Sequence, residues 1–246
     1  MPILRRIAND STLKARRRPT ALGRKARSRC REVAFGATAF FSTDGRTFPW
    51  RDEREPYRLA IAEILLQKTR AQSVVSTYES LLSAYPTPEA LAMCDVNDIE
   101  IRLRPLGLSG KRADQLKGMA TAVVMHGVHI FGSWRAVLVD VPGIGAYAAR
   151  AIASFGRAER VGIVDANVAR ILRRIFKIRT VDPRAVIFQK YADQIALYSD
   201  DVRATNFGLL DIGSLVCLPK PLCGRCPYNE FCPRYGIAAH PGKPER

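Results

Sequence analysis

Apolar residues recur at helical spacing along most of the chain, and this pattern predicts its fold class. An apolar run from Leu59 to Leu66 and an apolar stripe from Val74 to Leu82 predict one helical stretch over residues 57–85. The same spacing predicts further helices over residues 31–41, 87–93, 95–103, 109–124, 146–155, 184–198 and 204–216, and a helix that begins at residue 165. No segment alternates apolar and polar residues as a strand does, so the predicted class is all-α.

A Pro-Gly-Ile-Gly sequence at residues 142–145 interrupts the helical pattern and predicts a tight hairpin before the helix over residues 146–155. Gly143 and Gly145 can take positive φ, which would let the backbone reverse and turn its N–H groups outward. Amides at the start of a helix suit an anion such as a phosphate. The alternative is an αα-corner without a ligand. We expect Gly156 to close the following helix.

Three polar side chains stand out as candidates for chemistry. Asp165 begins a predicted helix, where an aspartate often serves only as the N-cap. Glu63 interrupts an apolar helical run, which is costly unless the carboxyl group faces a wet cleft or has a partner. Gln67 follows four residues later and is expected on the same helix face, so the two form either a pocket wall or a buried hydrogen-bonded pair. Tyr147 opens the helix after the hairpin, where a packed aromatic residue is the simpler interpretation.

Four cysteines lie close together near the C-terminus, at Cys217, Cys223, Cys226 and Cys232, in a proline-rich segment. Four thiolates within sixteen residues can wrap a single metal centre, either tetrahedral zinc or an iron–sulfur cluster. We therefore predict a metal site here and no disulfides.

Charge narrows the class of partner. A formal net charge of +16 and a pI near 10.1 favour a polyanion, either nucleic acid or an acidic membrane. No apolar run could span a membrane and no signal peptide is evident, so we expect a cytosolic protein. Ten Lys and Arg residues against one acidic residue predict a disordered basic tail over residues 1–29. In the helix over residues 109–124, Lys111, Arg112 and Lys117 are expected to face solvent.

The sequence excludes several enzyme classes. The three histidines, His126, His129 and His240, lie in loop or tail settings, so no Ser/His/Asp arrangement is indicated. There is also no P-loop and no dinucleotide-binding fingerprint.

Five segments in order carry a family resemblance: FPWR (48–51), AEILLQKT (62–69), VPGIG (141–145), VDANVARIL (164–172) and the cysteine segment. Together they resemble the helix-hairpin-helix DNA glycosylases with a C-terminal [4Fe–4S] loop, the superfamily of endonuclease III and the MutY-type adenine glycosylases. The match runs from about Cys30 to Tyr235. It implies two helical domains, with double-stranded DNA bound across them and one base flipped into the cleft between.

The resemblance also implies how the chain is divided. Residues 57–163 would form the helix-hairpin-helix barrel domain, and residues 30–56 with 164–235 the cluster-containing domain. Residues 1–29 and 236–246 would be tails. A monomer in the cytoplasm, associated with the nucleoid and not with a membrane, is expected.

Carried over to this sequence, the family's motifs give roles to individual residues. The backbone at Gly143, Ile144 and Gly145 would hold a DNA phosphate, and Asp165 would be the catalytic carboxylate. An ionised carboxylate stabilises the positive charge that develops on the deoxyribose as the glycosidic bond breaks. Bifunctional relatives have a lysine where this chain has Tyr147, and a phenol cannot form a Schiff base. The resemblance therefore implies hydrolysis without a lyase step.

Two features favour resemblance to the mismatch-specific thymine-DNA glycosylases, which excise T or U opposite G. The chain has the segment GLSGKRADQL (107–116), and too few residues follow the cysteines for the Nudix-like domain of adenine glycosylases. Glu63 and Tyr147 would then contact the flipped base and its sugar, and Gln67 and Lys68 would lie near the gap in the duplex.

Two alternatives stay open. In an adenine glycosylase acting on A opposite G or 8-oxoguanine, Glu63 would protonate the departing purine. In a different class of protein, the chain would be a non-catalytic DNA-binding protein that senses redox state through its cluster.

The cysteine segment departs from the family in one respect. Five residues separate Cys217 from Cys223, where the family usually has six. A [4Fe–4S] cluster is the expected cofactor, and zinc is the alternative. The cluster would be structural and would help to place Lys220 and Arg225 on DNA.

Overall fold

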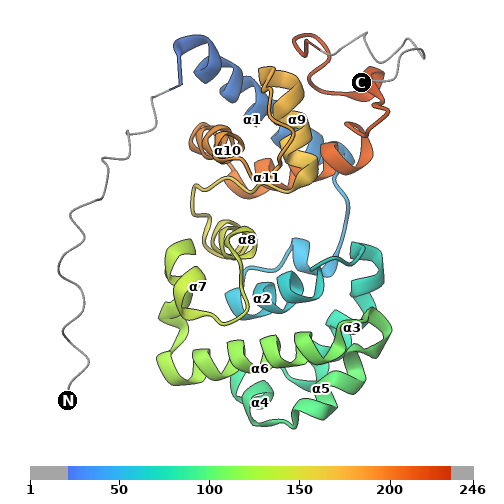
Figure 1. Ribbon diagram of the computed structural model, residues 1–246, viewed down its shortest axis with the longest axis vertical. Helices are drawn as coiled ribbons and strands as arrows, with labels where there is room; N and C mark the ends of the chain where they lie inside the picture. Colours follow the sequence, from blue (N-terminus) through green and yellow to red (C-terminus); the bar gives the residue numbers. More distant parts are fainter. Residues whose placement is uncertain (1–21, 234–246) are drawn as a thin grey trace, which may run out of the picture.

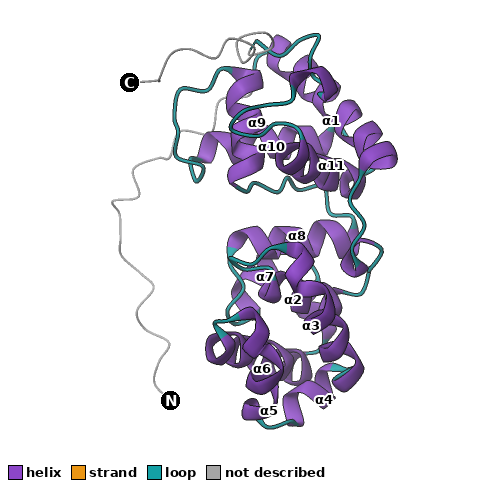
Figure 2. Ribbon diagram, turned by 90° about the vertical axis from the view of Figure 1, so that its right-hand side faces the viewer, coloured by secondary structure: helices purple, strands orange, loops and turns teal. Residues whose placement is uncertain are grey.

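The computed structural model describes residues 22–233, and within that range the chain forms helices and no strand (Figures 1 and 2). The all-α prediction is confirmed. Across the same residues, none of the helices combines the length and apolar character needed to cross a bilayer. The α-helices are α1 (Arg24–Asp44), α2 (Pro56–Leu65), α3 (Ala71–Ala84), α4 (Pro88–Met93), α5 (Val96–Leu103), α6 (Ser109–His126), α7 (Trp134–Asp140), α8 (Ala146–Arg157), α9 (Ala166–Phe176), α10 (Val186–Leu197) and α11 (Val202–Leu215). Short 3₁₀ turns lie at Pro49–Arg51, Arg104–Leu106, Val128–Phe131 and Cys223–Arg225.

The helices form two lobes with separate hydrophobic cores (Figure 1). Helices α2 to α8 form the barrel lobe, and α1 with α9, α10 and α11 forms the terminal lobe. The terminal lobe is therefore built from both ends of the described chain. Phe207 of α11 joins the two lobes, because its ring stacks on Phe155 of α8 at 3.8 Å and on Phe41 of α1 at 5.5 Å between ring centroids.

Helix α1 begins earlier than the sequence pattern suggested. It starts at Arg24, so the last six residues assigned to the basic tail are helical. Leu22 and Cys30 are buried in the core of the terminal lobe, which holds this end of the helix in place. The remainder of the predicted N-terminal tail and the predicted C-terminal tail, residues 236–246, lie outside the described residues.

The single helical stretch expected over residues 57–85 is wrong. Helix α2 ends at Leu65, α3 begins at Ala71, and between them Lys68 has a left-handed backbone with φ of 55°. Gln67 therefore lies in a turn and does not share a helix face with Glu63.

Arg112 holds this turn; it was expected in solvent and is only 1% exposed. One of its guanidinium nitrogens donates to the Gln67 carbonyl at 2.6 Å and to the Thr69 hydroxyl at 2.5 Å. The other donates to the carbonyls of Leu106 and Gly107 at 3.0 and 2.6 Å. Arg112 therefore ties the turn between α2 and α3 to the turn before α6.

Helix α8 also runs past its expected end. It continues to Arg157 and stops at Ala158, which has φ of 53°, so Gly156 does not close the helix. A Cβ atom on Gly156 would lie 3.1 Å from the Arg54 carbonyl oxygen, so this glycine permits close packing of α8 on the chain before α2.

Candidate active site

The predicted hairpin is a reverse turn between α7 and α8. The Ile144 amide donates to the Val141 carbonyl at 3.4 Å, and Pro142 and Gly143 occupy the two central positions. Gly143 has φ of 77°, as the last central position of a type II turn requires. Gln115 of α6 holds the turn by donating from Nε2 to the Gly143 carbonyl at 2.9 Å.

Only one of the two hairpin glycines has the expected positive φ. Gly145 has φ of −88° and an extended backbone, and a Cβ atom on it would meet nothing within 4 Å. The amides of Gly143 and Gly145 donate to no other group among residues 22–233, which leaves them available to an anion. The side chain of Ile144 is only 6% exposed, so it anchors the hairpin in the core and presents no surface to a ligand.

A cavity of about 1040 Å³ lies where the two lobes meet. It brings together residues that are far apart in the sequence: Glu63 from α2, Tyr147 from α8 and Asp165 from the start of α9. Of the other residues singled out from the sequence, Gly143, Gly145, Gln67 and Lys68 line the same cavity. Ile144, Lys220, Arg225 and the four C-terminal cysteines do not.

Asp165 serves both as the N-cap of α9 and as part of the cavity wall. Its Oδ1 accepts a hydrogen bond from the Val168 amide at 2.7 Å, and its Oδ2 accepts one from Asn167 Nδ2 at 3.0 Å. Two N–H donors and the start of a helix stabilise a negative carboxylate. Capping and cavity lining are therefore compatible in this one side chain.

Glu63 has the opposite environment. Its side chain is 8% exposed, and its carboxyl group has no hydrogen-bond partner among the described residues. Burial raises the pKa of Glu63 from 4.5 to about 8, and the nearby positive charge of Arg51 only partly offsets this. The carboxyl group is therefore mainly protonated at neutral pH and can donate a hydrogen bond into the cavity.

Tyr147 lines the same cavity as these two carboxyl groups, and this residue is 37% exposed. Burial of its hydroxyl end, and then the charges of Glu63 and Asp165, raise the pKa of Tyr147 well above its ordinary value. The phenol therefore stays protonated and can donate a hydrogen bond at neutral pH.

A charge cluster that the sequence did not reveal lies beside these groups. Asp211 of α11 is fully buried and accepts hydrogen bonds from both ends of the Arg51 guanidinium group, at 2.8 and 3.1 Å. It also accepts from the backbone amide and Nε of Arg46, at 3.0 and 2.6 Å. Both arginines line the cavity.

Cationic side chains lie on both sides of the cavity. Lys68 and Lys111 belong to the barrel lobe and Arg184 belongs to the terminal lobe. All three are exposed, so they provide a positive field around the opening. Such a field favours a polyanion that spans both lobes.

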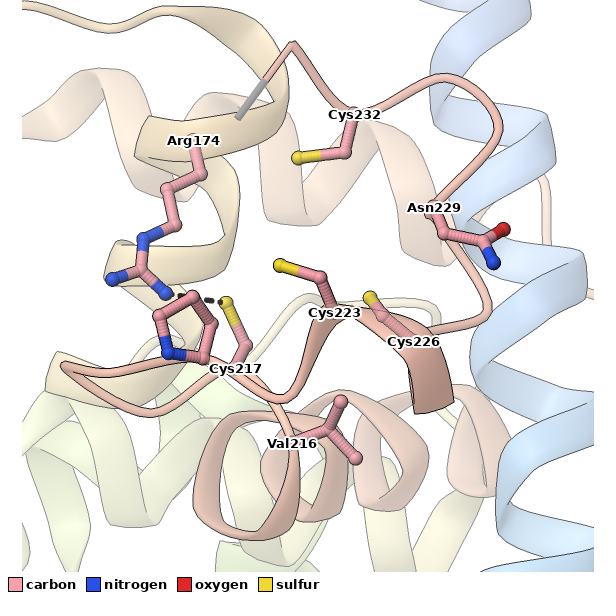
Figure 3. Close-up of a pocket in the computed structure, with 8 residues that line it drawn as sticks. Arg174, Val216, Cys217, Cys223, Cys226, Asn229 and Cys232 are labelled. Carbon is pink, nitrogen blue, oxygen red and sulfur yellow. Dashed lines mark hydrogen bonds between the residues drawn. The ribbon is translucent and has the colours of Figure 1, made fainter. Parts of the chain in front are cut away.

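The four C-terminal cysteines line one small pocket of the terminal lobe, and Figure 3 shows their sulfur atoms turned toward a common space. Arg174 of α9 reaches the same pocket and donates to the Cys217 sulfur at 3.2 Å (Figure 3). Among residues 22–233, no group of three or more His, Cys, Asp and Glu side chains is arranged to hold a single metal ion. Lys220 and Arg225 are exposed on this loop, and Arg225 lies 3.9 Å from Asp44 of α1.

A chain of hydrogen bonds connects the cysteine loop to Asp165. Arg170 of α9 donates to the Cys217 carbonyl at 2.7 Å and to Asn167 Oδ1 at 2.8 Å. Asn167 in turn donates to Asp165. The loop therefore helps to fix the carboxylate of Asp165 in the cavity.

Sequence reasoning missed several residues that shape the cavity. Arg51 and Asn167 lie inside segments that carried the family resemblance, and Lys111 and Gln115 lie in the GLSGKRADQL segment, so these segments held the signal. Arg46, Arg184 and Asp211 lie outside them, and their place in the site depends on long-range contacts.

Comparisons with known proteins give the family. The model of the HhH-GPD superfamily base excision DNA repair proteins matches residues 61–194. A thymine/uracil-DNA glycosylase of Methanothermobacter thermautotrophicus is 32% identical over 200 residues, which cover 80% of this chain and 90% of that protein. An adenine DNA glycosylase of Mycobacterium tuberculosis is 31% identical over 215 residues, which cover 85% of this chain and 70% of that protein.

A solved structure agrees with these matches. A thermostable thymine-DNA glycosylase superposes with a TM-score of 0.78 at 30% identity, over 86% of this chain and 99% of that one. The alternative of a non-catalytic DNA-binding protein is therefore set aside. The chain belongs to the HhH-GPD superfamily of base excision DNA repair proteins and is a DNA glycosylase, with DNA as its partner.

Proposed function

We propose that this glycosylase is monofunctional and releases T or U mispaired with G. The observation that carries the proposal is the shared cavity of Asp165, Glu63 and Tyr147, next to the hairpin amides. Two thymine or thymine/uracil glycosylases at 32% identity support the choice of base. The mismatched duplex would lie across both lobes, with the target base flipped into the cavity.

In this proposal Asp165 is the catalytic carboxylate. Breaking the N-glycosidic bond places positive charge on the deoxyribose, and a fixed carboxylate beside the sugar stabilises that charge. Its hydrogen bonds to Val168 and Asn167 leave lone pairs on both oxygens, one of which can orient the attacking water.

The hairpin and the turn after α2 would hold the duplex around the flipped nucleotide. The amides of Gly143 and Gly145 would bind a phosphate, while Gln67 and Lys68 would lie at the gap left in the duplex. Lys220 and Arg225 would contact DNA farther from the cavity, since both are exposed on the cysteine loop.

Tyr147 determines whether the reaction stops at hydrolysis of the glycosidic bond or goes on to cleave the DNA strand. A protonated phenol can orient the base or sugar, but it cannot form the Schiff base that strand cleavage by a lyase requires. Purified protein should therefore leave an intact abasic strand until alkali or heat is added. Nicking of the damaged strand without either would contradict the monofunctional proposal.

A second candidate is an adenine glycosylase. The pKa of Glu63, raised to about 8, keeps a proton available for a departing purine, and a relative named adenine DNA glycosylase is 31% identical. Labelled duplexes with G·T, G·U, A·G and A·8-oxoguanine pairs, each treated with alkali, separate the two candidates. We expect cleavage at the G·U and G·T pairs, and cleavage only at the adenine pairs would support the second candidate.

We also propose that Cys217, Cys223, Cys226 and Cys232 hold a [4Fe–4S] cluster. Four thiol side chains line one pocket, on a loop that Arg174 holds through the Leu218 carbonyl, and thiolates are the ligands of such a cluster. When bound, such a cluster staples the loop and takes no part in hydrolysis. Anaerobically purified protein should be brown and contain iron and sulfide. A colourless protein with one equivalent of zinc would contradict the cluster.

A further inference from the structure

The cavity that Tyr147 and Glu63 line also contains two arginines that share one aspartate. Asp211 is fully buried and binds both guanidinium groups. Arg51 uses both terminal nitrogens on Asp211 and is almost fully buried, with its guanidinium centre 4.1 Å from the centroid of the Phe207 ring. This ion pair is held in one place in the cavity wall.

Arg46 is held differently. Only its Nε and its backbone amide donate to Asp211, so its two terminal nitrogens have no hydrogen-bond partner among residues 22–233; the guanidinium centre lies 5.5 Å from the centroid of the Phe48 ring. The side chain is 32% exposed and lines the cavity. Arg46 therefore offers a rigid pair of N–H donors to a molecule in the cavity.

The charges of this cluster do not cancel. Two guanidinium groups and one carboxylate leave one positive charge, and the neighbouring Glu63 is neutral because burial raises its pKa. Burial, Glu63 and Asp165 raise the pKa of Tyr147, and the positive charges of Arg51 and Arg46 lower it, so both arginines lie close enough to act on a group beside Tyr147. Within hydrogen-bond reach of the two terminal nitrogens of Arg46, a species that becomes negative would be stabilised by this charge.

We propose that Arg46, oriented by Asp211 and backed by Arg51, stabilises the departing base as an anion. This inference rests on the proposed function, because thymine and uracil leave with the electron pair of the broken C1′–N1 bond. The charge spreads to the carbonyl oxygens O2 and O4, which are the acceptors that a guanidinium group binds best. Donors fixed in advance where charge develops lower the barrier most effectively.

The remaining atoms balance with water as the second reactant. The oxygen of water forms the new bond to C1′, and its proton passes to the Asp165 carboxylate and then to solvent. The released base anion takes a proton from solvent. Adenine would instead leave as a neutral base after protonation, so this cluster favours a pyrimidine over a purine.

A series of leaving bases tests the proposal. Opposite G, 5-fluorouracil, uracil and thymine form progressively less stable anions. In single-turnover assays with saturating enzyme, Arg46→Gln should release uracil about 100-fold more slowly than the wild type. The loss should be smaller for 5-fluorouracil and larger for thymine. An equal loss for all three bases would overturn the proposal.

Arg184→Gln is the matched control, because Arg184 is also an arginine lining the cavity but lies outside the Asp211 cluster. It should weaken DNA binding by the same factor for all three bases and leave their order of rates unchanged. If Arg184→Gln lost activity with the same dependence on the base as Arg46→Gln, the effect would come from the general loss of positive charge. That result would overturn the proposal.

Arg46→Lys is a second variant that tests the proposal if Arg46→Gln does not fold. It keeps the charge and loses the planar pair of donors, so its loss should be smaller but follow the same order of bases. A uniform loss would again overturn the inference. If the wild type releases no pyrimidine opposite G, the proposed function fails; if it releases uracil and the variants lose activity uniformly, only the role of Arg46 fails.

Discussion

Two carboxyl groups share the cavity between the lobes, and their surroundings are opposite. Asp165 caps α9 and accepts two hydrogen bonds, whereas Glu63 lies within an apolar helix and accepts none from the described residues. Burial raises the pKa of Glu63 to about 8. One site therefore contains a stabilised negative charge and a neutral proton donor.

The difference shows how secondary structure assigns chemical roles. The exposed amides at the N-terminus of α9 favour a carboxylate, and the middle of α2 disfavours one. A buried carboxyl group that keeps its proton can supply a hydrogen-bond donor at neutral pH, and a carboxylate at the start of a helix can supply electrostatic stabilisation.

The largest expected effect comes from removing the negative charge. Asp165→Asn keeps an N-cap but loses the carboxylate, so excision at a G·U pair should slow by about 1000-fold with little change in DNA binding. Single-turnover rates and equilibrium binding to the same duplex separate the two effects.

Asp201→Asn is the matched control for this change. Asp201 caps α11 with the same geometry, accepting from the Ala204 amide at 3.0 Å, but does not line the cavity. Its excision rate should stay near that of the wild type. Near-normal turnover by Asp165→Asn would remove the basis for its proposed role.

A smaller effect is expected when Glu63 is replaced, and it concerns the pH dependence of the free energy of unfolding. Unfolded chains lose this proton near pH 4.5, while the folded protein keeps it until about pH 8. The folded state thus binds more protons across this window, and stability falls as pH rises through it. Glu63→Gln has no such proton to lose. As pH rises from 6 to 8, the free energy of unfolding of the wild type should therefore fall by about 2 kcal/mol relative to that of Glu63→Gln.

Urea unfolding at several pH values measures this difference. Glu79→Gln, on the exposed face of α3, supplies the control and should show no such trend. A constant difference between Glu63→Gln and the wild type across the window would mean that Glu63 is charged in the folded protein.

The smallest expected effect concerns the position of the turn between α2 and α3, which is proposed to contact DNA. Arg112→Lys removes the guanidinium group, whose two terminal nitrogens join Gln67 and Thr69 to the turn before α6. Excision should slow about 10-fold. Fluorescence of 2-aminopurine placed next to the target base should show less base extrusion. Arg102→Lys on α5 is the control, and an equal loss there would argue against a positioning role for Arg112.

Local patterns predicted much of this fold. The helices follow from apolar spacing, the hairpin from Pro142 and Gly143, and the cap at Asp165 from its residue type. These features depend on neighbours within a few residues, so the sequence around them contains the necessary information.

Several of the errors share one cause, which is contact between residues far apart in the sequence. The turn after Leu65 is held by Arg112, more than forty residues away, and the charge cluster joins Arg46 to Asp211 across 165 residues. The early start of α1 likewise depends on packing in the terminal lobe. Spacing along the chain carries no signal for such contacts.

The central claim is that the cavity holds Glu63 protonated, while Asp165, which lines the same cavity, acts as the catalytic carboxylate. The most direct measurement is a carbon-13 NMR titration of protein labelled at its glutamate side-chain carboxyl groups, with Glu63→Gln used to assign the signal. We predict that the Glu63 signal changes near pH 8. A change near pH 4.5, the ordinary value for glutamate, would contradict the account.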